Sequence, residues 1–283
     1  MSARQPAEEY YVSHQDQVSE DRFLVQSPDG TQIPVWVDGT GPPLVLVHGA
    51  LSDHTTFSRL IAELRDRVTT FSMDRRGRGE TGDLGGDYTI EREFEDVAAV
   101  VEAVAGRTGD SVALWGYSYG ADCAMGGAAL TDKIHHLVVY EPGLGTPYQP
   151  GSIEAVEKAV LADDRDGAVV ALLLGIVEMS PEEIEFMRAS PLWSTRLENV
   201  GTMPRELRAE DSWIYESGQF DAITAPVLVL AGSESPAIQD DATHRALSAL
   251  PDARLETLIG HGHIAHQTDP ELIASIVLEF ISS

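Results

Sequence analysis

The segment at residues 115–120, with the sequence WGYSYG, constrains the fold of this chain most. It contains the pattern G-x-S-x-G between an apolar run typical of a buried strand, residues 112–115, and a run of small and apolar residues typical of a buried helix, residues 119–130. In this pattern the chain makes a sharp turn from strand to helix, which strains the backbone at Ser118. Glycines flank the serine because neighbouring backbone passes too close to leave room for a Cβ. The pattern therefore predicts a strand–turn–helix unit that presents the Ser118 hydroxyl at the end of a strand.

Strand and helix patterns alternate along most of the remaining chain. We expect a hairpin over residues 22–37, further strands at 44–47, 68–73, 137–140, 227–231 and 254–259, and helices at 55–67, 90–105 (ending at Gly106), 236–250 and 272–280. Such alternation predicts an α/β fold with a doubly wound, mostly parallel sheet.

Residues 143–221 interrupt this alternation. They show helix-like patterns without strands, and carry 15 acidic against 6 basic residues. Because the segment leaves from one strand end and returns at the next strand, we expect a helical lid over the edge where α/β sheets bind ligands. The predicted organisation is a flexible arm at 1–19, a core at 20–142 and 222–283, and the lid at 143–221.

Composition excludes several classes of function. The 283 residues include 46 acidic and 19 basic side chains, for a formal net charge of −27, which disfavours binding to nucleic acids and to anionic membrane surfaces. No apolar run reaches the ~18 residues of a membrane span, and the first residues lack the apolar centre of a signal peptide. The single cysteine, Cys123, permits no internal disulfide. These features favour a cytoplasmic protein that acts on a small molecule, and they leave its oligomeric state open.

Four motifs together resemble the α/β-hydrolase superfamily. They are the segments at residues 47–50 (VHGA), 74–79 (DRRGRG), 116–120 (GYSYG) and 260–263 (GHGH), in the family's order. The resemblance implies a serine-nucleophile branch in which Ser118 is the nucleophile, His263 is the general base, and the backbone N–H groups of Ala50 and Tyr119 form the oxyanion hole. It implies no cofactor and no metal, and the spacing of His261, His263 and His266 fits none of the usual zinc patterns.

The third member of the triad departs from the commonest family pattern. Most relatives carry an aspartate shortly after the strand equivalent to 227–231, but here that position is Ser235. Glu141, which follows the preceding strand, is the favoured acid, as in several branches of the superfamily. Glu234, Asp240 and Asp241 remain alternatives.

The chemistry expected from these residues is cleavage of an ester or lactone of a small, hydrophobic molecule through a Ser-His-Glu triad and an acyl-enzyme. The same fold also serves C–C bond hydrolases, lyases, cofactor-free perhydrolases and low-turnover receptors, which remain alternatives. Three aromatic residues of the predicted lid, Trp193, Trp213 and Tyr215, are expected to line the substrate pocket.

Overall fold

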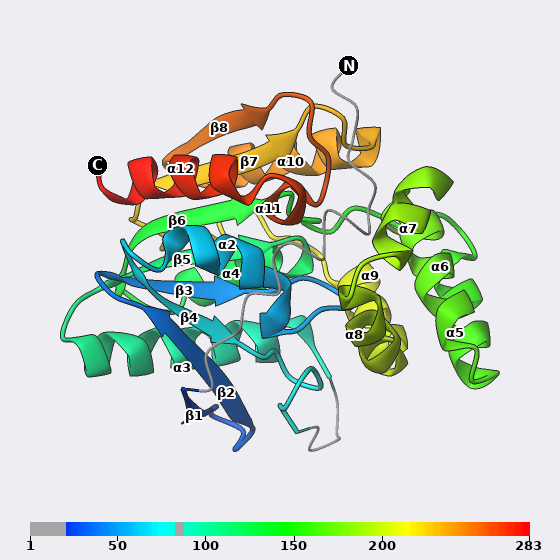
Figure 1. Ribbon diagram of the computed structural model, residues 1–283, viewed down its shortest axis with the longest axis horizontal. Helices are drawn as coiled ribbons and strands as arrows, with labels where there is room; N and C mark the ends of the chain where they lie inside the picture. The colour runs from blue at the N-terminus through cyan, green and yellow to red at the C-terminus, as the bar shows by residue number, and fades with distance from the viewer. Residues whose placement is uncertain (1–20, 83–87) are drawn as a thin grey trace.

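The computed structural model describes residues 21–82 and 88–283, so the arm expected at residues 1–19 lies outside the described residues. Eight strands form one sheet in the order β1-β2-β4-β3-β5-β6-β7-β8 (Figure 1). Strand β2 runs antiparallel to both its neighbours, and the pairs from β4 to β8 are parallel. The strands are β1 (Arg22–Gln26), β2 (Gln32–Gly39), β3 (Pro43–Val47), β4 (Thr69–Met73), β5 (Val112–Tyr117), β6 (Ile134–Tyr140), β7 (Val227–Gly232) and β8 (Ala253–Leu258).

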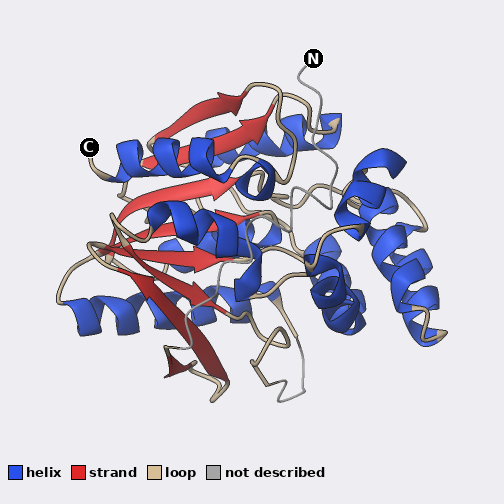
Figure 2. Ribbon diagram, in the orientation of Figure 1, coloured by secondary structure: helices blue, strands red, loops and turns tan. Residues whose placement is uncertain are grey.

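Helices cover both faces of the sheet, as Figure 2 shows. Residues of α3 and α4 join the buried cluster on one face, and residues of α2 and α12 join the cluster on the other. The helices and 3₁₀ turns of this core are η1 (His54–Phe57), α2 (Ser58–Leu64), α3 (Ile90–Thr108), α4 (Tyr119–Ala128), α10 (Ala237–Ala249), α11 (Ala265–Thr268) and α12 (Pro270–Ile281). The predicted α/β class and the mostly parallel, doubly wound sheet are confirmed.

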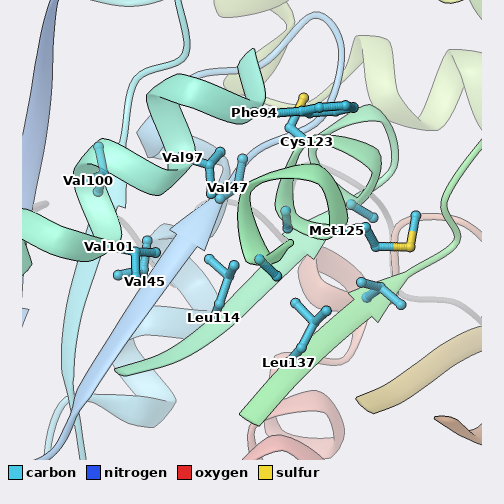
Figure 3. Close-up of a cluster of buried hydrophobic side chains, with 14 of the residues drawn as sticks. Val45, Val47, Phe94, Val97, Val100, Val101, Leu114, Cys123, Met125 and Leu137 are labelled. Atoms are coloured by element: carbon cyan, nitrogen blue, oxygen red, sulfur yellow. The ribbon is translucent and has the colours of Figure 1, made fainter. Parts of the chain in front are cut away.

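The small residues of α4 are explained by close packing against α3. A Cβ on Gly126 would lie 2.1 Å from the Phe94 ring, and one on Gly127 would lie 2.5 Å from Cγ1 of Val97. Figure 3 shows how α3, α4 and the strands beneath them share this apolar cluster. The buried helix thus holds the turn before it against a rigid layer, which fixes the position of Ser118.

Five helices lie between β6 and β7, together with one 3₁₀ turn. Figure 1 places them on the side toward which the parallel strands point. They have an apolar cluster of their own, to which Leu172, Trp193 and Met203 contribute. The elements are α5 (Ser152–Leu161), α6 (Arg165–Gly175), α7 (Pro181–Arg188), α8 (Leu192–Asn199), η2 (Val200–Thr202) and α9 (Met203–Ser212).

Two helix boundaries differ from the sequence prediction. Helix α3 continues through Gly106 and ends at Gly109, whose φ of 78° and N–H bond to the Ala105 carbonyl form a left-handed cap. A glycine in an exposed helix costs too little to end it. The helix predicted at 55–67 begins instead as η1 and becomes α2 only at Ser58. Among the described residues, no helix combines the length and apolar character needed to cross a bilayer.

Candidate active site

Ser118 occupies the turn between β5 and α4, with φ 54° and ψ −131°. A Cβ on Gly116 would lie 2.4 Å from the Gly120 carbonyl oxygen, and one on Gly120 would lie 2.3 Å from the His48 carbonyl oxygen. No side chain fits at either position, so the two glycines allow the turn to close. Ser118 is half-buried while its neighbours on both sides are buried, so Ser118 keeps an exposure that they lack.

The parallel register brings Glu141 beside Ser118. Tyr117 and Tyr140 are paired residues of β5 and β6, so Ser118 and Glu141 both follow directly at the sheet edge. Ser118 N–H donates to the Tyr140 carbonyl at 2.8 Å, and Glu141 N–H donates to the Leu230 carbonyl at 3.1 Å. Each residue is therefore fixed to the next strand along.

His263 bridges the two. Its Nε2 lies 3.1 Å from Ser118 Oγ, and its Nδ1 lies 2.5 Å from Glu141 Oε2. The loop that carries His263 is held by the Tyr140 hydroxyl, which donates to the Gly262 carbonyl and accepts from the Ala265 N–H. The structure thus brings together the serine, histidine and glutamate that the sequence predicts, in the order needed to relay a proton.

The Glu141 carboxylate is buried, and its second oxygen is also occupied. Oε1 accepts hydrogen bonds from the Gly232 N–H at 2.7 Å and from the Ser235 hydroxyl at 2.5 Å. Burial alone raises the pKa of Glu141, but the contact with His263 and these two donors outweigh it and hold that pKa below its ordinary value. Glu141 is therefore an ionised group that can stabilise a positive charge on His263.

The alternative acids lie elsewhere. Glu234, Asp240 and Asp241 are exposed on the loop after β7 and on α10, whereas Nδ1 of His263 contacts Glu141. Ser235, at the position expected for the common aspartate, instead donates to Glu141.

The other histidines near the motifs have different surroundings. His261 lies at the surface, 3.5 Å from Asp269. His266 is enclosed by aromatic rings, with the Tyr117 ring centroid 4.2 Å away, and burial lowers its pKa to about 3. His48 braces its own turn, since Nδ1 lies 2.9 Å from the Gly49 carbonyl and Nε2 accepts from the Arg75 N–H at 3.1 Å.

Two small cavities meet at Ser118 and His263, one of about 60 Å³ and one of about 30 Å³. Ala50 lines both, and Tyr119 lines the first. As the first residue of α4, Tyr119 has an N–H that no carbonyl of its own helix can accept, and the helix N-terminus favours negative charge there. The loop of Ala50 is held close, because a Cβ on Gly49 would lie 2.9 Å from the Ser118 Cβ. Both residues predicted for the oxyanion hole therefore adjoin the candidate nucleophile.

The three predicted pocket aromatics pack elsewhere in the structure, which revises that part of the sequence analysis. Neither cavity is lined by any of them within the described chain. Trp193 is buried inside the helical insertion, where its Nε1 donates to Asp166 at 3.1 Å. Trp213 packs edge-on against Phe94 and lines a separate surface hollow, and Tyr215 stacks on Phe220.

The inserted helices contribute other residues that the sequence analysis missed. Leu172 lines both cavities, and Ile176 and Val177 extend the apolar wall. The one available signal was the apolar run at 168–177 within an acidic segment, which identified the helix but not the face it turns to the site. Glu210 and Arg196 also line the cavities, and nothing in their local sequence distinguishes them from surface charges.

Comparison with known proteins identifies the family. The sequence model described as the alpha/beta hydrolase family matches residues 44–276, which is most of the chain. The chain belongs to the alpha/beta hydrolase family. This hydrolase is 32% identical to an alpha/beta hydrolase from Sphaerobacter thermophilus, whose crystal structure superposes with a TM-score of 0.78 over 92% of this chain and 100% of the other.

Two curated relatives have named activities. One is the 2-(acetamidomethylene)succinate hydrolase of Mesorhizobium japonicum, 27% identical over 94% of this chain and 98% of that protein. The other is the pimeloyl-[acyl-carrier protein] methyl ester esterase of Stenotrophomonas maltophilia, 27% identical over 87% of this chain and 95% of that protein. The hydrolase is therefore an enzyme of the alpha/beta hydrolase type.

Proposed function

We propose that this hydrolase cleaves an ester or lactone of a small molecule through a Ser118–His263–Glu141 triad and an acyl-enzyme. The observation that carries the proposal is the continuous relay from Ser118 Oγ through both ring nitrogens of His263 to Glu141 Oε2. The names of two relatives, a methyl ester esterase and a succinate-derivative hydrolase, support acyl transfer to water.

Each residue has a defined role in this reaction. His263 accepts the Ser118 proton as Oγ attacks the carbonyl carbon, and then gives it to the leaving alcohol. Glu141 holds the imidazole in orientation and stabilises its charged form. The N–H groups of Ala50 and Tyr119 stabilise the oxyanion, an interaction worth about 3–4 kcal/mol for one donor. His263 then takes a proton from a water molecule as its oxygen attacks the acyl carbonyl, and returns the proton to Ser118 Oγ when the bond between Oγ and the acyl carbon breaks and the acid leaves.

The helical insertion acts as a lid in this proposal. Leu172, Ile176 and Val177 cover Ser118 with apolar side chains, which favour a hydrophobic substrate and exclude bulk water from the reacting atoms. Small cavities of this kind favour a small substrate.

Active-site labelling tests the proposal. A fluorophosphonate should label the wild-type protein and leave Ser118→Ala unlabelled, while p-nitrophenyl ester hydrolysis by this variant should fall by about 10⁶-fold. The control is Ser212→Ala, since Ser212 is an exposed serine of α9 whose hydroxyl contacts only the Ala209 carbonyl among the interactions of the described chain. Equal labelling of Ser118→Ala and wild type would exclude Ser118 as the nucleophile.

A further inference from the structure

One of the two cavities at Ser118 has a positively charged wall. Arg196, on α8, is 4% exposed and lines the 30 Å³ cavity together with Ser118 and His263. The same side chain also borders a tightly packed region formed by two leucines and four hydroxyl residues: Leu51, Leu192, Ser52, Thr55, Thr56 and Thr195. Arg196 thus lies beside the reacting serine, with hydroxyl-bearing residues close by.

The remaining lining of this cavity combines apolar walls with a polar end. The apolar residues include Leu51, Leu173, Met179 and Met187, and the polar ones include Ser52 and Gln267. In such surroundings a guanidinium charge is screened far less than at a surface. Its effect reaches the triad's neighbours, because the positive charge of Arg196 acts to lower the pKa of both Tyr117 and His266, although burial is the largest influence on each.

The other cavity has acidic rather than basic side chains in its lining. Its acidic side chain besides Glu141 is Glu210, which accepts a hydrogen bond from the Tyr148 hydroxyl. Burial and the nearby Asp122 carboxylate raise the pKa of Glu210 well above its ordinary value, which disfavours a negative charge at this position. The Glu141 carboxylate is already engaged within the triad, since its Oε2 lies 2.5 Å from His263 Nδ1. Among the described lining residues of both cavities, Arg196 is the one lysine or arginine.

We propose that Arg196 forms a carboxylate-binding subsite, so that the substrate is an ester bearing a carboxylate at one end and an apolar section between that group and the cleaved bond. This inference rests on the proposed esterase function. A guanidinium offers five N–H donors in a planar fork that matches a carboxylate, so the subsite does not require Arg196 to lack other contacts. The apolar walls suit the section in between, and Ser52, which lines the same cavity, can donate to the second carboxylate oxygen.

Matched ester pairs test the subsite. Monomethyl glutarate is compared with methyl 5-methylhexanoate, in which an isopropyl group replaces the carboxylate on the acyl side. On the alcohol side, 4-acetoxybutanoate is compared with 4-methylpentyl acetate. The wild-type protein should prefer the carboxylate ester of at least one pair by tenfold or more in kcat/KM. Arg196→Gln should reduce kcat/KM for that ester roughly 10- to 100-fold more than for its isopropyl match, the effect of losing a charged hydrogen bond.

Two further variants control for packing. Arg196→Lys keeps the charge but not the fork, and should retain part of the preference. Arg208→Gln removes an arginine of α9 that pairs with Glu154 and Glu157 at the surface, and it should leave the preference unchanged. Melting temperatures measured on each variant identify any loss of fold.

Binding measured without turnover separates this inference from the proposed function. Calorimetry of monomethyl glutarate or 4-acetoxybutanoate with Ser118→Ala should detect binding, and adding Arg196→Gln should weaken it by the same factor as in the kinetics. No wild-type preference in either pair, or an equal loss for both esters of a pair, would overturn the subsite. Binding that depends on Arg196 in a protein that hydrolyses no ester would retain the subsite and overturn the proposed function.

Discussion

Ser235 Oγ lies 2.5 Å from Oε1 of Glu141, on the carboxylate oxygen that His263 does not use. The residue at the position of the usual aspartate is thus in contact with the glutamate one strand away. The two strand ends lie side by side at the same edge of the sheet, because β6 and β7 are adjacent parallel strands. Glu141 follows β6 rather than β7, but it contacts the histidine at the same edge of the sheet as an aspartate after β7 would.

Glu141→Gln should lower kcat by about 10²–10⁴ with little change in KM, because an amide cannot stabilise the imidazolium formed in the transition state. The measurement is steady-state hydrolysis of a p-nitrophenyl ester. Glu234→Gln is the matched control, since Glu234 is exposed on the adjacent loop, and it should retain nearly full activity. A Glu141→Gln enzyme within tenfold of wild type would show that the triad does not depend on this carboxylate.

Adding Ser235→Asp to Glu141→Gln should restore part of the lost kcat. An aspartate at 235 would place a carboxylate beside the position of Glu141 Oε1, on the strand end where most relatives carry theirs. In the wild-type background the same change should instead reduce activity, because the two adjacent carboxylates would repel each other. Measuring Ser235→Asp in both backgrounds completes a double-mutant cycle. Additive effects would contradict the idea that a carboxylate at position 235 can replace the one at position 141.

The sheet could be predicted from the sequence because strand and helix patterns are local, and the resemblance to the family indicated Ser118, His263 and Glu141 as residues that meet at its edge. The elbow needs its glycines at fixed offsets, and parallel strands end at a common edge wherever they begin. The pocket lining could not be predicted in the same way. Leu172 and Trp193 are both apolar residues of the insertion, and only the packing of its short helices decides which of them faces Ser118. Arg196 is buried for the same reason, although its sequence context resembles that of an exposed arginine.

Leu172→Ala should change substrate choice, whereas Trp193→Ala should not. Leu172 lines both cavities, so its truncation makes room for a longer acyl chain. We expect kcat/KM to rise for p-nitrophenyl hexanoate relative to the acetate. Trp193 fills the interior of the insertion, and its loss should reduce stability by about 3–5 kcal/mol while changing all esters by similar factors. Equal selectivity profiles for the two variants would count against the lid assignment.

Two glycine substitutions should have opposite effects on stability. Gly120→Ala forces a Cβ to within 2.3 Å of the His48 carbonyl oxygen and should cost about 1–3 kcal/mol while displacing the loop of Ala50. Gly106→Ala places a Cβ in open space on exposed α3 and should stabilise the protein by about 0.5–1 kcal/mol. Urea unfolding gives both values, and the esterase assay should report a loss of activity only for Gly120→Ala.

His266 should make the folded protein sensitive to acid. Burial, with added repulsion from His263 and Arg196, lowers the pKa of His266 to about 3, whereas in the unfolded chain it is near 6.5. Between these values the unfolded state binds the extra proton, so stability falls as pH decreases, by up to about 1.4 kcal/mol per pH unit from this residue.

His266→Phe suits the surrounding rings of Tyr117, Phe57 and Trp115 and should reduce that slope, as measured by urea unfolding at intervals from pH 7 to pH 4. His244→Gln changes an exposed histidine of α10 and should leave the slope as it is. An unchanged slope in His266→Phe would mean that the buried imidazole takes up its proton without unfolding the protein.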